Sequence, residues 1–172
     1  MIHPQTLLIR DERPDDAAAI AQVTRTAFAT AEHSSGTEEF IIAALRSAGQ
    51  LSLSLVAQMD GGIVGHVAIS PVEISDGARD WYGLGPVSVL PDCQGTGVGS
   101  RLIRASLDRL RASGARGCVV LGEPSYYGRF GFSAHSALTL ADVPPAYFQA
   151  LGFEGQVPAG TVRYHASFEA TS

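Results

Sequence analysis

Three glycines at alternate positions lie between a short apolar stretch and an amphipathic segment. The stretch is residues 87–90, the glycines are Gly95, Gly97 and Gly99, and residues 98–113 repeat apolar side chains with the 3.6-residue period of a helix. Glycine lets the backbone turn sharply and leaves its N–H groups uncovered. The first N–H groups of a helix have no internal partner, and the helix dipole is positive at that end. Such a junction binds phosphate, so we expect a phosphate-bearing cofactor here.

The residues around the glycines separate the known classes of phosphate loop. A P-loop ends in Gly-Lys-Ser/Thr, whereas this chain contains no lysine, which excludes that class. A dinucleotide-binding loop reads G-x-G-x-x-G and follows its strand closely. Gly95 and Gly97 fit this pattern, but the third position is Ser100 and four residues separate the strand from the glycines. Glu123 stands where a ribose-binding acid would end the next strand, so a dinucleotide site stays open as an alternative.

Two further motifs point to another class of loop. Gln94 begins a Q-x-x-G-x-G pattern. Residues 121–132 contain a short helix with Tyr127, followed by a Gly-Phe pair that starts the next strand, and Phe132 of this pair lies five positions after Tyr127. Together these motifs resemble the GNAT N-acetyltransferase superfamily and, within it, a bacterial branch of the YhbS type. The specific motifs lie between residues 83 and 132, and a weaker likeness extends over nearly the whole chain.

The resemblance implies a cofactor and the residues that hold it. The superfamily uses acetyl-CoA, so the implied reaction is direct transfer of an acetyl group to a primary amine. Backbone N–H groups of residues 87–89 would bind the pantetheine and polarise the acetyl carbonyl, and those of residues 95–100 would hold the pyrophosphate. The implied cofactor residues are Val87, Ser88, Val89, Gln94, Gly95, Thr96, Gly97, Val98, Gly99 and Ser100.

Tyr127 is the candidate proton donor for the leaving thiolate. A tyrosine has an unperturbed pKa of about 10, above the value of roughly 8.5 for a thiol, so it stays protonated at neutral pH. The alternative is that Tyr127 only packs against Phe130 and Phe132.

The general base is harder to assign. Glu123 follows an expected central strand near the acetyl group and is favoured, although its carboxylate could instead bind backbone donors at the next helix start. The other candidates are a water chain, Glu73, Glu32, His33 and His135. His66 lies in an apolar strand and reads as a hydrogen-bonded core residue.

Composition describes the class of protein. With 172 residues, 45% hydrophobic and 17% charged, the chain fits a single globular domain over residues 1–172. Cys93 and Cys118 make neither a disulfide framework nor a metal cluster, so we expect no metal, reduced thiols and a cytoplasmic location. No secretory signal or membrane span is recognisable. Homodimers are common among the relatives that the resemblance implies.

Charge is distributed unevenly along the chain. The net charge is −5, but five arginines and one acid between residues 98 and 116 give that stretch +4, leaving −9 for the rest. The basic stretch could meet the 3′-phosphate of CoA or could be a solvated helix face. The acidic remainder argues against nucleic acid and favours a cationic amine as acceptor.

These motifs need a sheet to position them, and periodicity and turn signals indicate one. The expected strands are residues 6–10, 51–57, 63–69, 83–90, 118–121, 132–140 and 161–168. The expected helices are residues 14–28, 37–49, 98–113, 124–130 and 144–151. The fold class is α/β with a mixed (α+β) sheet and helices on both faces. The GNAT resemblance adds that the sheet is mostly antiparallel and splayed between its fourth and fifth strands.

Pro86 lies within one expected strand, and since it has no N–H it should occupy a bulge or border a gap in the sheet. Two other functions remain: a CoA-binding regulatory module of this fold with little catalysis, and a dinucleotide-binding enzyme. The acceptor is not readable, because the segments that would select it, residues 29–36 and the last strands, carry no motif.

Overall fold

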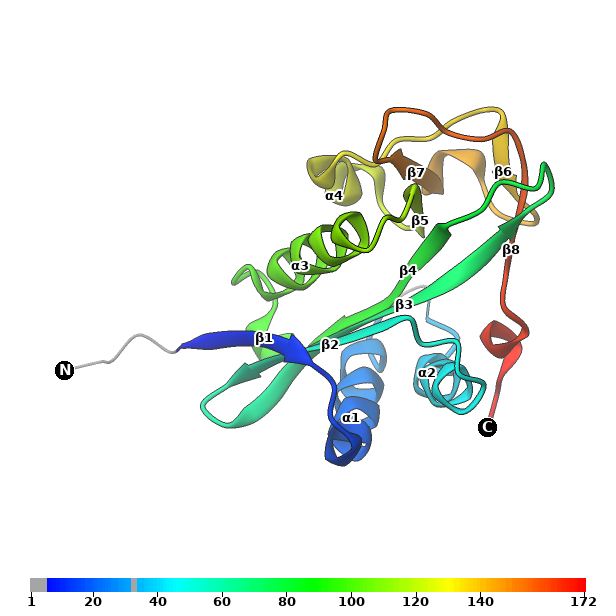
Figure 1. Ribbon diagram of the computed structural model, residues 1–172. Coiled ribbons are helices and arrows are strands. Elements are labelled where there is room, and N and C mark those ends of the chain that lie inside the picture. Colours follow the sequence, from blue (N-terminus) through cyan, green and yellow to red (C-terminus); the bar gives the residue numbers. More distant parts are fainter. Residues whose placement is uncertain (1–5, 32–33) are drawn as a thin grey trace.

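The computed structural model describes residues 6–31 and 34–172, and its centre is a strongly twisted mixed sheet (Figure 1). Its main path runs β1-β2-β3-β4-β5-β7, while β8 pairs with β3 and β6. The β4–β5 and β6–β8 pairs are parallel and the others are antiparallel. The strands are β1 (Leu7–Asp11), β2 (Leu53–Met59), β3 (Gly62–Ile74), β4 (Trp81–Val89), β5 (Gly117–Leu121), β6 (Leu138–Leu140), β7 (Phe148–Gly152) and β8 (Gly160–Tyr164).

Helices cover both faces of this sheet, as predicted (Figure 1). The α-helices are α1 (Ala17–Phe28), α2 (Glu38–Ser47), α3 (Val98–Ala112) and α4 (Pro124–Tyr127). The short 3-10 turns are η1 (Pro14–Asp16), η2 (Pro91–Cys93), η3 (Gly128–Phe130), η4 (Pro145–Tyr147) and η5 (Ala166–Glu169). Helix α3 buries its apolar face, including Leu102 and Leu107, against one face of the sheet. Ile20 of α1 and Ile42 of α2 pack on the other face, against side chains that alternate with the first set along each strand.

The sheet opens between β4 and β5. The two strands pair from Trp81 opposite Gly117 to Gly83 opposite Val119, and β4 then continues to Val89 without β5 beside it. In the same region the β3–β4 register shifts, so that Gly85 and Pro86 together oppose one residue of β3. Pro86 therefore lies in a bulge, and the predicted splay between the fourth and fifth strands is confirmed.

The C-terminal third differs from the sequence-based expectation. Residues 132–140 were expected to form one strand, but only Leu138–Leu140 does so, preceded by a single bridge from Ser133 to Ala150. The expected helix over residues 144–151 is wrong, because only η4 is helical and Phe148–Gly152 is strand β7. Pairing with the edge of β5 holds this segment extended, so tertiary context overrides local pattern. The last expected strand ends at Tyr164, and η5 follows it.

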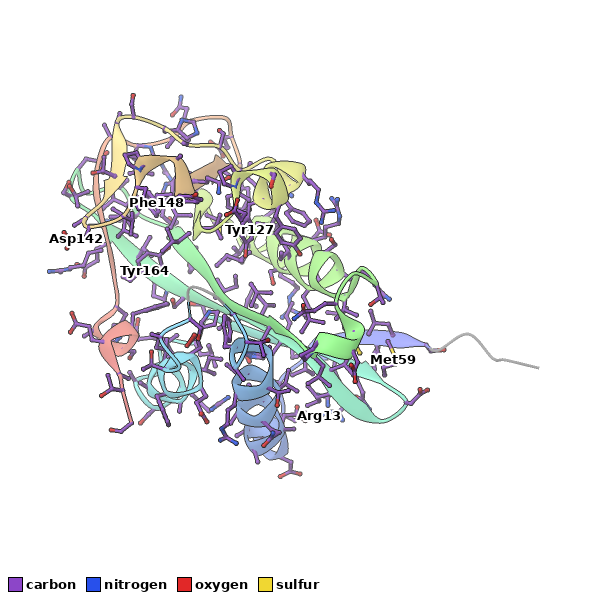
Figure 2. The ribbon with its side chains drawn as sticks, turned by 180° about the vertical axis from the view of Figure 1, so that it is seen from behind. Arg13, Met59, Tyr127, Asp142, Phe148 and Tyr164 are labelled. Carbon is purple, nitrogen blue, oxygen red and sulfur yellow. The ribbon has the colours of Figure 1, made fainter. Side chains whose placement is uncertain are left out.

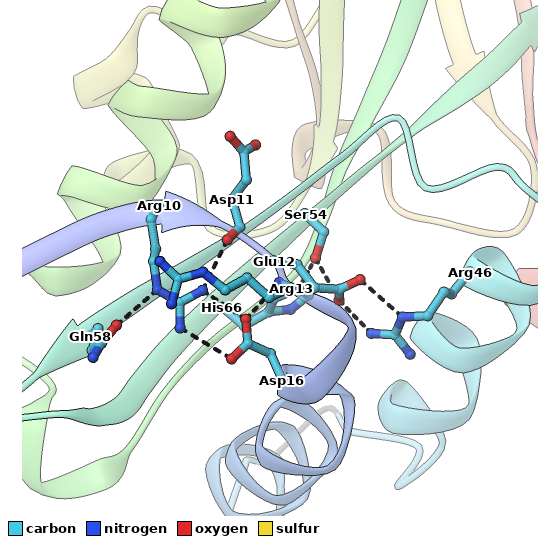
Figure 3. A network of polar contacts seen from close by, with 9 residues as sticks. All are labelled: Arg10, Asp11, Glu12, Arg13, Asp16, Arg46, Ser54, Gln58 and His66. Carbon is cyan, nitrogen blue, oxygen red and sulfur yellow. Dashed lines mark hydrogen bonds and ion pairs between the residues drawn. The ribbon is translucent and has the colours of Figure 1, made fainter.

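A polar network joins β1, β2, β3 and α2 (Figure 3). His66 is fully buried and its Nε2 lies 2.7 Å from Ser54 Oγ, which donates to Glu12 Oε1 at 3.0 Å. Arg46 donates to both oxygens of the Glu12 carboxylate. Because the single Ser54 proton goes to Glu12, His66 Nε2 must carry the proton it shares with Ser54. The prediction that His66 is a hydrogen-bonded core residue is confirmed. No helix in the described part of the chain has both the length and the apolar character needed to span a bilayer.

Candidate active site

The backbone of β4 faces the opening in the sheet with alternate residues. The Leu90 N–H donates to Val64 O of β3 at 2.9 Å, and Ser88 opposes His66 in the same register. Since neighbouring N–H groups in an antiparallel strand point to opposite sides, Ser88 directs its amide toward β3 as Leu90 does. The N–H groups of Val87 and Val89 point to the other side of β4, where β5 no longer pairs with it. Of the three predicted amides, two are therefore directed at the opening.

The glycine loop turns directly from β4 into α3. Gly95 and Gly97 have φ values of +77° and +91°, and Gly97 is the N-cap of α3. This left-handed backbone favours glycine, and a Cβ at either position would meet no atom within 4 Å. The side chain of Gln94 donates from Nε2 to Val89 O at 3.1 Å, which ties the loop to the end of β4. Gln94 therefore shapes the loop through its side chain.

Both sequence motifs line one open cavity of about 450 Å³. Its lining residues are Val87, Val89, Cys93, Gln94, Gly95, Gly97, Gly99, Ser100, Tyr126, Tyr127 and Arg129. Three predicted cofactor residues are not part of this lining. The Ser88 side chain faces Thr24 of α1, the Thr96 hydroxyl donates to Cys93 O, and Val98 is buried in the core.

Tyr127 enters the cavity from α4. Its ring lies against the backbone of Gly122, where even a Cβ atom would collide with it, and packs edge-on to Phe132. Burial, with a smaller contribution from the neighbouring Tyr126 phenol, raises the pKa of Tyr127 to about 12. The phenol therefore remains protonated at any pH at which the protein would be assayed, as a proton donor requires. Its packing against Phe130 and Phe132 is present as well, so the two predicted roles are compatible.

The favoured general base does not reach the cavity. Glu123 is exposed, lies at the N-cap of α4 and makes no side-chain capping hydrogen bond, so its alternative capping role is wrong. Glu73 is exposed and pairs with Arg163, and His135 contacts Ser133 Oγ at 3.1 Å. The remaining candidates, Glu32 and His33, lie outside the described residues.

Sequence reasoning missed the cation on the cavity wall. The five arginines between residues 98 and 116 are absent from the lining, and Arg109, for example, pairs with Asp11. Arg129 lines the cavity instead, with its guanidinium over the rings of Tyr126 (4.8 Å to the centroid) and Phe130 (5.4 Å). The signal that could have identified Arg129 is its position as a charged residue in η3, directly after Tyr127. Residues 6–31 and 34–172 contain no cluster of three or more His, Cys, Asp or Glu side chains suited to a metal.

Tyr164 of β8 was also missed. A Cβ at Gly83 would lie 2.5 Å from the Tyr164 ring, so this side chain covers the last β4 residue that pairs with β5. Burial, together with the nearby Cys118 thiol and Tyr127 phenol, raises the pKa of Tyr164. No local signal could have found this residue, because β8 reaches the opening only through its pairing with β3.

Comparison with known proteins decides the family. Residues 17–132 match the profile of the Acetyltransferase (GNAT) family. The chain belongs to this family. Over 135 residues it is 38% identical to the uncharacterized N-acetyltransferase YhbS of Escherichia coli, with 77% of this chain and 78% of YhbS covered. The predicted GNAT membership and the YhbS-type resemblance are confirmed, and the chain is an acetyltransferase.

Two solved GNAT structures superpose on nearly the whole chain. A GNAT family acetyltransferase from Brucella melitensis, in complex with acetyl-CoA, is 52% identical with a TM-score of 0.85, covering 95% of this chain and 98% of that one. Escherichia coli YhbS, in complex with CoA, is 32% identical with a TM-score of 0.88, and 100% and 97% of the two chains are covered. The predicted GNAT fold is therefore confirmed.

Proposed function

We propose that this GNAT acetyltransferase transfers the acetyl group of acetyl-CoA directly to a primary amine of a small molecule or a protein. One observation carries the proposal: the glycine loop, the directed amides of β4 and the Tyr127 phenol all face a single cavity. The relatives from Brucella melitensis and Escherichia coli were solved with acetyl-CoA and CoA. We place the reaction in the cytoplasm, where Cys93 and Cys118 stay free thiols.

The residues present fit such a cosubstrate. The loop amides and the positive end of α3 suit a diphosphate, and Arg129 adds a full charge beside them. The N–H groups of Val87 and Val89 lie along the opening, where they suit the amide-rich pantetheine and the acetyl carbonyl. Fixed donors of this kind stabilise the oxygen that gains charge during acyl transfer.

Proton transfer is divided between Tyr127 and solvent. Tyr127 donates its proton to the departing sulfur as the C–S bond breaks and the amine nitrogen bonds to the acetyl carbon. Among the described residues, the cavity lining contains no carboxylate and no imidazole. We therefore propose that the amine loses its proton to a chain of water molecules rather than to Glu123.

Calorimetry and a thiol-release assay test the proposal. The chain should bind CoA and acetyl-CoA, not NAD, and should release free thiol from acetyl-CoA when amines are added. Binding of CoA without any amine-dependent release would instead support the regulatory module. Binding of NAD but not CoA would support the dinucleotide alternative.

A further inference from the structure

A second cavity, of about 640 Å³, lies beside β8 and η5 and shares no lining residue with the first. Its apolar wall includes Pro71, Val72, Leu140, Val162 and Phe168. This volume and this mostly apolar wall are typical of small-molecule sites. The cavity could therefore hold the acceptor, provided that it communicates with the opening between β4 and β5.

Tyr164 lies at the boundary between the second cavity and this opening. It lines the second cavity, and its ring covers Gly83 at the end of the β4–β5 pairing. Tyr127, which lines the first cavity, comes from α4, the helix that follows β5. Figure 2 shows the positions of both tyrosines. A molecule in the second cavity would thus meet Tyr164 before it met the acetyl group.

A buried hydroxyl lies beside this junction. Ser70 is fully buried and its Oγ has no hydrogen-bond partner among the described residues. Ser70 opposes Gly83 in the β3–β4 register, so its side chain is on the sheet face that Tyr164 covers. An unpaired buried hydroxyl costs free energy, and a ligand nitrogen would satisfy it.

The charges at the cavity favour a cation. Two carboxylates line it, and Arg163 pairs with one of them, Glu73. Glu169 of η5 is exposed and has no ion-pair partner among residues 6–31 and 34–172. Its carboxylate would attract an ammonium group to the mouth of the cavity. Apolar walls would then desolvate that group and favour the neutral amine that acyl transfer needs.

We infer that this second cavity binds the acceptor, and that the acceptor is a primary amine on an apolar body without a carboxylate, such as an arylalkylamine. The inference rests on the proposed function and names the substrate class for it. Glu169 attracts the cation, the apolar wall binds the body, and Tyr164 meets the amine at the junction, next to the unpaired Ser70 hydroxyl.

Three amines test the class. Phenethylamine has the apolar body, phenylalanine adds a carboxylate to that body, and ethanolamine lacks it. With acetyl-CoA, phenethylamine should give a kcat/KM at least tenfold above both others. Equal or better turnover of ethanolamine or phenylalanine would overturn this inference and leave the proposed function standing. No turnover of any of the three amines, with acetyl-CoA bound, would also overturn this inference, whereas the proposed function would fall only if protein amines gave no thiol release either.

Two variants test the cavity. Leu140→Trp fills it and should lower kcat/KM for phenethylamine at least tenfold with an unchanged Kd for acetyl-CoA, whereas Leu8→Trp, on the exposed part of β1, should change neither.

Glu169→Gln should raise KM for phenethylamine about threefold at low salt, an effect that added salt removes, and Glu154→Gln should not. Unchanged kinetics in Glu169→Gln, or in a folded Leu140→Trp, would overturn the assignment.

Discussion

Arg129 donates a hydrogen bond from Nη2 to Ser100 Oγ at 2.9 Å and so joins η3 to the first turn of α3. Among the described residues Arg129 has no ion-pair partner. Its guanidinium packs over the rings of Tyr126 and Phe130. The other N–H groups of the guanidinium remain available beside the glycine loop. A cation in this place, at the positive end of a helix, is suited to an anion with more than one charge.

Replacing Arg129 with Gln should weaken CoA binding about tenfold, or about 1.4 kcal/mol, because a charge-assisted contact to the diphosphate is lost. Titration calorimetry at fixed salt measures the change. The affinity for dephospho-CoA should fall by the same factor in Arg129→Gln, since this ligand lacks the 3′-phosphate but keeps the diphosphate. Arg109→Gln, which breaks an exposed pair with Asp11, should leave CoA binding unchanged. An unaltered affinity in Arg129→Gln would contradict the placement of the diphosphate.

Gly97→Ala should lower both stability and CoA affinity. Its φ of +91° costs a side-chain-bearing residue about 1–2 kcal/mol, although the added Cβ meets nothing. Gly61→Ala is the matched control, because Gly61 has a φ of +81° and equally open surroundings in the β2–β3 turn. Chemical denaturation should show similar losses of stability in the two variants, whereas calorimetry should show weaker CoA binding only in Gly97→Ala. If Gly97→Ala and Gly61→Ala bound CoA equally well, the proposed contact between the glycine loop and the cofactor would be wrong.

The fold up to Phe132 was predictable because its elements carry their own signals. Helix α3 has a clean apolar stripe that ends near Gly114, and Pro86 marks the bulge beside the splay. Strand β7 was not predictable, since Phe148–Gly152 follows two prolines and is extended only because it completes the edge of β5.

The site likewise has residues that could be predicted from local motifs and residues that could not. The glycine loop and Tyr127 are local motifs, and the structure brings them to one cavity. Glu123 was favoured from its position after β5, but a position along the chain does not determine the direction in which a side chain points. Tyr164 comes from a distant strand, so only the assembled sheet reveals it.

Tyr127→Phe should lower kcat at least tenfold and leave the Kd for acetyl-CoA nearly unchanged, because only the proton on the phenol is removed. Tyr147→Phe, at an exposed tyrosine outside the cavity, should retain full activity. Since the pKa of Tyr127 is raised to about 12, the wild-type pH–rate profile should show no fall from Tyr127 ionisation between pH 6 and 9. Full turnover in Tyr127→Phe would remove the assigned role.

The free energy of unfolding should depend on pH through His66. Burial is the main cause that lowers the pKa of His66 to about 4, with Arg46 lowering it further and Glu12 opposing them. The unfolded chain has a histidine pKa of about 6.5, so between these values the unfolded state binds more protons than the folded state. Stability contributed by neutral His66 is therefore full above pH 6.5 and is lost as the pH falls toward 4.

Urea unfolding at several pH values measures this dependence. The slope should approach about 1.4 kcal/mol per pH unit near pH 5, and His66→Gln should flatten it even though it lowers stability at pH 7. His135→Gln, at a half-buried surface residue, should keep the wild-type slope. The carboxyl pKa values of Glu12 and Asp16 are also lowered, by their arginine partners, but these groups act only below about pH 4.5. A slope between pH 5 and 6.5 that persisted in His66→Gln would show that another group takes up the proton.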